Sequence, residues 1–130
     1  MLDASALVRA FAYDHPTAVS WLQRVAGAEL RAAWPSHLYA EVANAVLRLA
    51  RAKRIARSLA EDTIAQARAV NAIVFPIEQS VVEALGMAFD RGLTVYDAAY
   101  IVLAEALGAP LVTADRRLAE ATEQAVLLPE

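Results

Sequence analysis

The sequence of 130 residues has no cysteine, only two histidines and a single lysine. The lack of cysteine excludes a disulfide framework, a thiolate nucleophile and every zinc site that uses cysteine ligands. Two histidines are too few for a histidine-rich metal centre, so oxygen atoms would have to hold any metal ion. No apolar stretch approaches the ~18 residues of a membrane-spanning helix, and the start Met1-Leu2-Asp3 does not fit a signal peptide. We therefore expect a cytoplasmic protein with no membrane partner.

The residues that are abundant describe a folded, helix-rich protein. Hydrophobic residues make up 58% of the chain and 31 residues are alanine, which excludes disorder and favours closely packed helices. A chain of this length usually forms one domain around one core, so we expect residues 1–130 to be a single domain. The net charge of −3 argues against a general nucleic-acid coat protein, although an acidic total still permits a local basic site.

Turn and capping residues divide the chain into short strands that alternate with helices. Strands are expected at residues 1–3, 30–34, 73–77, 109–113 and 126–128. Helices are expected at residues 4–10, 16–27, 35–53 and 94–108, after capping boxes at Ser58 and Ser80, and after Asp115. Strands separated by helices of this length form a parallel sheet that is covered on both faces. The predicted fold class is α/β, with a short central parallel sheet flanked by about seven helices.

Four of the fifteen acidic residues fall where such a sheet would bring them together. Asp3 follows the first expected strand, and Asp115 follows the strand at 109–113. Glu41 stands early in the helix after the second strand, and Asp97 lies in the first turn of a later helix. Because ligands bind outside the carboxyl ends of parallel strands, we expect these four side chains to converge.

Each of the four acids also has a purely structural explanation. Asp3 and Asp115 are well placed as helix N-caps, and Asp97 would complete a capping box with Thr94. Glu41 could reach solvent or pair with a nearby cation, although most of its neighbours are apolar. Taken singly, the structural explanation is at least as good as the functional one for the three aspartates.

The four acids together favour a metal site. Two carboxylates ~5 Å apart repel each other by about 3 kcal/mol at an effective dielectric constant of 20. A cluster of four would destabilise the fold unless a cation neutralised it. Carboxylates without histidine or cysteine suit Mg²⁺ or Mn²⁺, and such ions commonly serve phosphoryl chemistry.

The motifs around these acids also carry a family resemblance. They are Leu2-Asp3-Ala4-Ser5-Ala6-Leu7, Glu41-Val42-Ala43-Asn44-Ala45, Tyr96-Asp97-Ala98-Ala99-Tyr100 and Leu111-Val112-Thr113-Ala114-Asp115-Arg116-Arg117-Leu118. In order and spacing they resemble PIN-domain ribonucleases along essentially the whole chain, and are most similar to the VapC toxins of toxin–antitoxin pairs. Only Met1 and Leu2 precede the first aspartate, which departs from the family pattern and indicates either a short first strand or a truncated start site.

The resemblance implies a site and an activity. Asp3, Glu41, Asp97 and Asp115 would form the metal site, and Thr113 would supply a hydroxyl that supports it. Ser5 and Asn44 hold positions that would assist. The implied function is Mg²⁺-dependent endoribonuclease activity on RNA, with Mn²⁺ as a substitute ion, inhibition by a cognate antitoxin protein, and a homodimer.

Two other functions compete with this one. The first is a catalytically silent PIN-like domain that serves as a protein- or RNA-binding module; the intact quartet of acids counts against it. The second is a phosphoacceptor receiver domain, which would need paired acids near the first strand and a lysine late in the chain. The only lysine is Lys53, so we set this alternative aside.

Five basic residues crowd into ten positions with no acid among them: Arg48, Arg51, Lys53, Arg54 and Arg57. They fit equally well as a solvated helix end, stabilised by the helix dipole, and as a strip that follows RNA phosphates. Arg116 and Arg117 border Asp115 and are the better substrate-binding candidates.

The remaining features are expected to be structural or to serve partners. Four aromatic residues near the acids are expected in the core: Trp34, Tyr39, Tyr96 and Tyr100. The apolar faces around residues 21–22 and 47–50 are more numerous than a small monomer easily buries. They would suit a dimer contact or a groove that binds an antitoxin helix. His15 and His37 have no predicted role.

Overall fold

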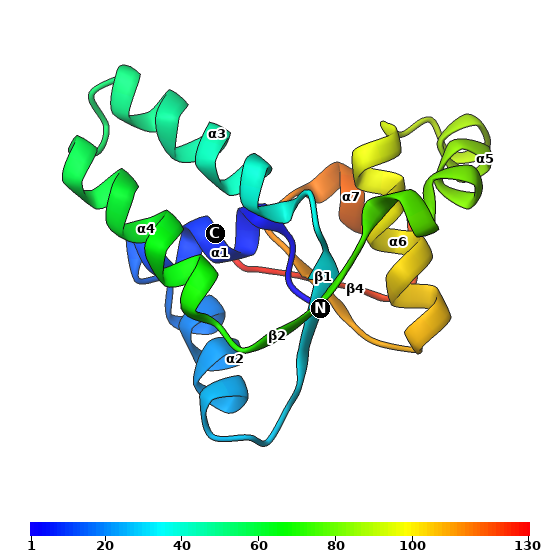
Figure 1. Cartoon of the computed structure of the whole chain (residues 1–130), viewed down its shortest axis with the longest axis horizontal. Coiled ribbons are helices and arrows are strands. Elements are labelled where there is room, and N and C mark those ends of the chain that lie inside the picture. Colours follow the sequence, from blue (N-terminus) through cyan, green and yellow to red (C-terminus); the bar gives the residue numbers. More distant parts are fainter.

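The computed structural model describes every residue from Met1 to Glu130. Helices and short strands alternate along the chain (Figure 1). The elements are α1 (Ala4–Tyr13), α2 (Pro16–Ala26), β1 (Ala32–Pro35), α3 (Leu38–Arg51), α4 (Arg57–Ala69), β2 (Ala72–Phe75), the 3₁₀ turn η1 (Ile77–Gln79), α5 (Val81–Arg91), α6 (Val95–Leu107), β3 (Leu111–Thr113), α7 (Arg116–Glu120) and β4 (Ala125–Leu127). The predicted α/β class and the number of helices are confirmed.

The strands form two parallel pairs. β1 pairs with β2, and β3 pairs with β4. The N-terminal segment joins the second pair through a single parallel bridge between Leu2 and Val112. There the N–H of Asp3 donates to the carbonyl oxygen of Val112 at 3.1 Å. The predicted parallel pairing and short first strand are therefore confirmed, but strands of three or four residues make two separate pairs where one sheet was expected.

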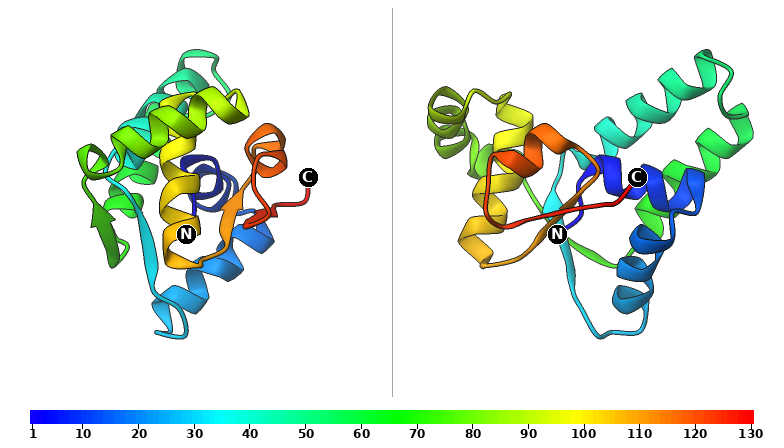
Figure 2. Two further views of the ribbon diagram at one scale, coloured as in Figure 1. Left: turned by 90° about the vertical axis from the view of Figure 1, so that its right-hand side faces the viewer. Right: turned by 180° about the vertical axis from the view of Figure 1, so that it is seen from behind.

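Helices lie on both sides of the strands, as predicted. Figure 1 shows α1 to α4 on one side, and α5, α6 and α7 on the other. α6 packs against β1 and β3, and α1 packs against β3. α3 and α4 contact each other and form an arm that projects away from the strands, which is also visible from behind in Figure 2. None of the helices is both long and apolar enough to cross a lipid bilayer.

The core contains most of the aromatic residues that were expected there. Trp34 and Tyr100 are almost completely buried, and the indole N–H of Trp34 donates to the hydroxyl of Tyr39 at 3.2 Å. Tyr96 is an exception, because 59% of it is exposed. It lies one residue before Asp97, in the first turn of α6.

The two predicted apolar faces differ in the structure. Trp21 and Leu22 are partly buried against the main core, and Leu22 also lines a mostly apolar groove on the surface. Leu47 on α3 remains 42% exposed. Larger apolar exposure occurs on α5, where Val82 and Phe89 are 78% and 81% exposed.

Two predicted helix caps are wrong. α4 begins at Arg57, so Ser58 already lies inside the helix, and the N-cap is Ala56 without a side-chain hydrogen bond. Ser80 is the N-cap of α5 but does not bond to the helix. Its hydroxyl instead lies 3.5 Å from the carbonyl oxygen of Ile77, because the turn η1 immediately precedes α5.

Candidate active site

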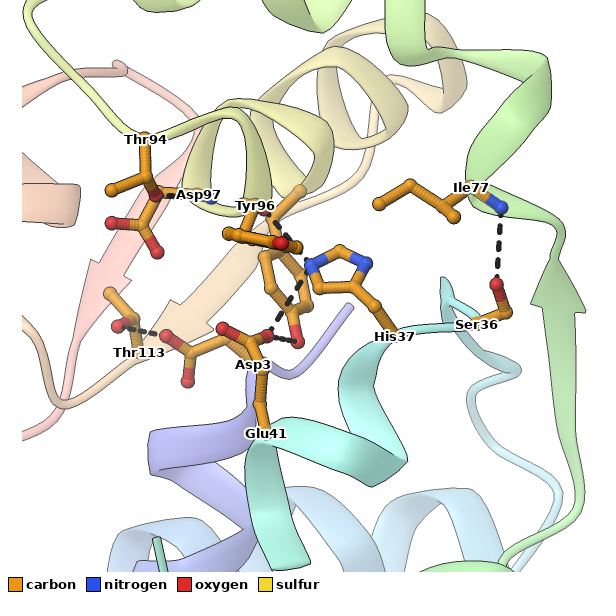
Figure 3. A network of polar contacts seen from close by, with 10 residues as sticks. Asp3, Ser36, His37, Glu41, Ile77, Thr94, Tyr96, Asp97 and Thr113 are labelled. Atoms are coloured by element: carbon orange, nitrogen blue, oxygen red, sulfur yellow. Dashed lines mark hydrogen bonds and ion pairs between the residues drawn. The ribbon is translucent and has the colours of Figure 1, made fainter. Parts of the chain in front are cut away.

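Asp3 is the most deeply buried of the four acids, with 5% of its surface exposed. It caps α1 by accepting a hydrogen bond from the N–H of Ala6 at 2.9 Å. One carboxylate oxygen also accepts from the hydroxyl of Ser5 at 2.6 Å. The other accepts from the hydroxyl of Thr113 at 2.5 Å (Figure 3). Burial raises the pKa of Asp3 from 3.8 to about 6, although both hydroxyls lower it and the charge of Glu41 adds to the rise.

Thr113 and Ser5 connect Asp3 to the end of β3. The buried hydroxyl of Thr113 donates to Asp3 and accepts from the N–H of Asp115 at 2.9 Å. The hydroxyl of Ser5 accepts from the N–H of Ala114 at 2.9 Å. Because each hydroxyl bonds both to Asp3 and to the backbone beyond β3, the two segments are held in one position relative to each other.

Glu41 projects from the first turn of α3 and is half-buried. The hydroxyl of Tyr100, a buried residue of α6, donates to its carboxylate at 2.7 Å. Burial raises the pKa of Glu41, and the charge of Asp97 raises it further. Glu41 is therefore a carboxylate in partly apolar surroundings that is held by a neighbouring helix.

His37 also contacts Glu41, a role that the sequence analysis missed. Its Nε2 atom lies 3.3 Å from the Glu41 carboxylate and 3.0 Å from the carbonyl oxygen of Tyr96 (Figure 3). Both of these groups only accept hydrogen bonds, so Nε2 carries a proton, while the buried Nδ1 has no partner. Burial lowers the pKa of His37. The i,i+4 spacing of His37 and Glu41 is the signal that could have revealed this contact.

Asp97 and Asp115 complete the group of acids from α6 and from the loop after β3. The N–H of Asp97 bonds to the hydroxyl of Thr94 at 3.1 Å, so half of the predicted capping box forms. Burial raises the pKa of Asp97, and the charge of Asp115 adds to this rise. Asp115 is exposed and caps α7 by accepting from the N–H groups of Arg117, at 2.9 Å, and Leu118, at 3.3 Å.

The charge of one acid raises the pKa of the next at three steps around the site. Glu41 raises the pKa of Asp3, Asp97 raises that of Glu41, and Asp115 raises that of Asp97. No lysine or arginine forms an ion pair with any of them. Successive acids thus lie near enough for one charge to affect the next, and three of the four also serve as caps or in a cap; their convergence on one metal site stays a prediction.

The donor set suits a hard divalent cation. All four acids offer carboxylate oxygens, and their mutual repulsion would be relieved by a positive charge. As they stand, no three acidic or histidine side chains are close enough to form a ready-made metal site. Mg²⁺ keeps several water ligands when it is bound by few carboxylates, so a pair of these side chains with water is sufficient. Asn44, a predicted assistant, is exposed on α3 and makes no side-chain hydrogen bond.

Residues 1–124 match the family model described as the PIN domain. The chain belongs to the PIN-domain family. It is similar to Ribonuclease VapC3 from Pyrobaculum aerophilum, with 55% identity over 38 residues, which are 29% of this chain and 29% of that protein. It is also similar to Exonuclease VapC9 from the same organism, with 50% identity over 44 residues, or 34% of this chain and 33% of the relative. These matches therefore span only about a third of the curated relatives.

A solved structure shares the fold over nearly the whole chain. The crystal structure of PAE2754 from Pyrobaculum aerophilum superposes with a TM-score of 0.77 and 32% sequence identity. The match covers 98% of this chain and 81% of that one. The family and fold predicted from the sequence motifs are confirmed.

Proposed function

We propose that this PIN domain is a Mg²⁺-dependent endoribonuclease that hydrolyses RNA phosphodiester bonds and acts as the toxin of a toxin–antitoxin pair. The observation that carries the proposal is the placement of four acids at the ends of strands and the starts of helices, where the charges of Glu41, Asp97 and Asp115 raise the pKa of Asp3, Glu41 and Asp97 respectively. None of the four is paired with a lysine or arginine. The names of the two VapC relatives agree with nuclease activity.

In this proposal, Asp3, Asp97 and Asp115 hold the ion directly or through water, and Glu41 completes the negative pocket and orients the attacking water. When bound, Mg²⁺ supplies a Lewis acid that polarises the phosphate and lowers the pKa of water. In-line attack would leave 3′-hydroxyl and 5′-phosphate ends. Mn²⁺ offers similar coordination chemistry and is expected to substitute.

The remaining groups of the site position the acids. The hydroxyls of Thr113 and Ser5 orient Asp3 through hydrogen bonds. The hydroxyl of Tyr100 orients Glu41, with the imidazole of His37 beside it. Such fixed orientation reduces the rearrangement that is needed when substrate and metal bind.

The test is cleavage of a mixed cellular RNA pool by the purified protein, in Mg²⁺ and in EDTA. Asp97→Asn is the test variant. Asp62→Asn, which alters an exposed acid on α4, is the matched control. Discrete fragments that require both Mg²⁺ and Asp97, and that form normally with the control, would support the proposal. A folded, antitoxin-free protein that binds RNA without cutting it would contradict it and favour the silent binding module.

We also propose a cognate antitoxin protein, a homodimer and a cytoplasmic location. Expression of the chain should arrest growth, and co-expression of its cognate antitoxin should restore it. Growth arrest that also occurs with Asp97→Asn would contradict a nuclease toxin. Light scattering of the purified protein tests the dimer, and a monomer mass at micromolar concentration would count against it.

A further inference from the structure

A groove beside the four acids contains arginine residues that the proposed chemistry does not use. It has a volume of about 770 Å³. Its walls come from α1, from α3 and from the loop after α3, and it reaches Ser5 and Asp115 of the candidate active site. The groove is therefore continuous with the site, and a ligand that fills it would touch both.

The charge in this groove is positive away from the site. Arg9, Arg48 and Arg54 line it, all three are exposed, and none forms an ion pair with a carboxylate. Asp115 is the one acid in the lining. A polyanion would first meet three unpaired guanidinium groups along the groove and then the acids. The polyanion and the acids are both negative, so a metal ion would have to bridge them.

The structure also divides the basic segment that the sequence presented as one unit. Arg48 and Arg54 line the groove beside the site, and Arg9 from α1 joins them. Arg51 and Arg57 line a different groove, between α3 and α4. The two predicted roles of this segment, solvated helix end and phosphate-binding strip, can therefore be tested on separate residues.

We propose that the groove of Arg9, Arg48 and Arg54 binds the sugar–phosphate backbone of single-stranded RNA and leads it to the acids. This inference rests on the proposed ribonuclease function. Guanidinium groups match phosphate oxygens in a two-pronged geometry. The volume is in the range that holds a ligand of a few rings, which is a short length of one strand. Tyr13, 48% exposed in the same lining, offers a face on which a base can stack.

The test measures the affinity for a fluorescein-labelled twelve-nucleotide RNA by anisotropy, with Asp97→Asn as the background so that the RNA is not cut. Phosphate contacts carry no sequence information, so an oligouridine probe is adequate. Arg48→Gln with Arg54→Gln is the groove variant. Arg51→Gln with Arg57→Gln is the control, which removes the same formal charge from the same segment but outside the groove; Arg57 is paired with Glu61 at 2.6 Å.

The expected difference lies in the salt dependence. Each phosphate contact with a single strand contributes about 0.7 to the slope of log affinity against log salt, so the groove variant should lose about 1.4. Between 50 and 200 mM salt, the parent should then lose about sevenfold more affinity than the groove variant. The control should keep the slope of the parent. Tyr13→Ala should bind about tenfold more weakly at every salt concentration, because stacking is not ionic.

Two outcomes would overturn the inference. Equal slopes for the groove variant and its control would mean that net charge, and not this groove, attracts RNA. An unchanged affinity of the groove variant, with a normal circular dichroism melt, would leave the groove to a ligand other than RNA.

Cleavage assays in the wild-type background separate the two proposals. Mg²⁺-dependent cutting with an unchanged KM in the groove variant refutes the groove alone. If the groove variant loses RNA binding but the wild type does not cut RNA, only the proposed nuclease function is refuted.

Discussion

Replacing Asp3 by asparagine should stabilise the metal-free protein. The carboxylate is almost completely buried and has no cationic partner, which raises its pKa to about 6. The folded state therefore binds a proton more tightly than the unfolded state, and ionisation of Asp3 opposes folding. Asparagine removes that charge, keeps nearly the same shape and is as good an N-cap as aspartate for α1.

The size of the effect follows from the two pKa values. At 1.36 kcal/mol per pH unit, a rise from 3.8 to about 6 corresponds to a destabilisation of about 3 kcal/mol at pH 7 and above. The amide must donate to the hydroxyl of Thr113, which now donates to the carboxylate, and we allow about 1 kcal/mol for this change. The net gain for Asp3→Asn is then about 2 kcal/mol, or roughly 7 °C in melting temperature for a domain of this size.

The gain should depend on pH in a defined direction. Because the folded pKa of Asp3 is raised, the penalty of the wild type is full above pH 7, about half as large at pH 5, and nearly absent at pH 3. The stability advantage of Asp3→Asn should therefore shrink as the pH falls from 7 to 4. Mg²⁺ should reverse the ranking at neutral pH, because an ion that binds only the folded wild type stabilises it by mass action.

Urea unfolding in EDTA at pH 7.5, 5 and 4 measures the free energy of unfolding of the wild type, of Asp3→Asn and of the exposed control Asp62→Asn. The control should stay within ~0.5 kcal/mol of the wild type at each pH. Asp3→Ala loses the cap and all the carboxylate hydrogen bonds, and should be less stable than Asp3→Asn. A metal-free Asp3→Asn that is less stable than the wild type at pH 7.5, or a difference that does not change with pH, would refute the reasoning.

Three further predictions concern the other members of the site. Asp97→Asn should be at least as stable as the wild type without metal and should gain much less melting temperature from Mg²⁺; an equal response to Mg²⁺ would argue against this residue as a ligand. Thr113→Val should lose about 2–3 kcal/mol in urea unfolding, because the N–H of Asp115 and the Asp3 carboxylate both lose a partner; a loss below ~0.5 kcal/mol would show that this network contributes little. Tyr100→Phe should lower the free energy of unfolding by about 1 kcal/mol, because Glu41 loses a hydrogen bond. In RNA cleavage this variant should reduce kcat while changing KM less. An unchanged kcat would exclude a positioning role for the Tyr100 hydroxyl.

Much of the fold and of the site could be predicted because local rules and tertiary needs agree there. Pro16 begins α2, and Gly92 and Gly108 end α5 and α6 with positive φ angles of 65° and 60°, where glycine is least strained. Asp3 and Asp115 each follow a strand segment and cap the next helix, so one short stretch of sequence indicates both the element boundary and the position of the acid.

Predictions failed where a local pattern had a competing partner. Ser58-Leu-Ala-Glu61 reads as a capping box, but α4 starts one residue earlier, and Glu61 forms an ion pair with Arg57 at 2.6 Å. Tyr96 stands next to buried positions in the sequence, yet it remains exposed in the structure. Hydrogen bonds and exposure of this kind depend on which neighbour arrives from another part of the chain.

The sequence by itself determined the order of the elements, the family, and the position of the four acids next to strand ends or in first helical turns, because strand ends and capping residues are local features. Only the tertiary structure decided that Asp3 is buried without a cation, that His37 and Tyr100 reach Glu41, and that Arg48 and Arg54 share a groove with Arg9. Each of these depends on atoms from segments that are distant in sequence. Desolvation, hydrogen bonding and charge act through distances in space, and those distances are set only when the helices pack against the strands.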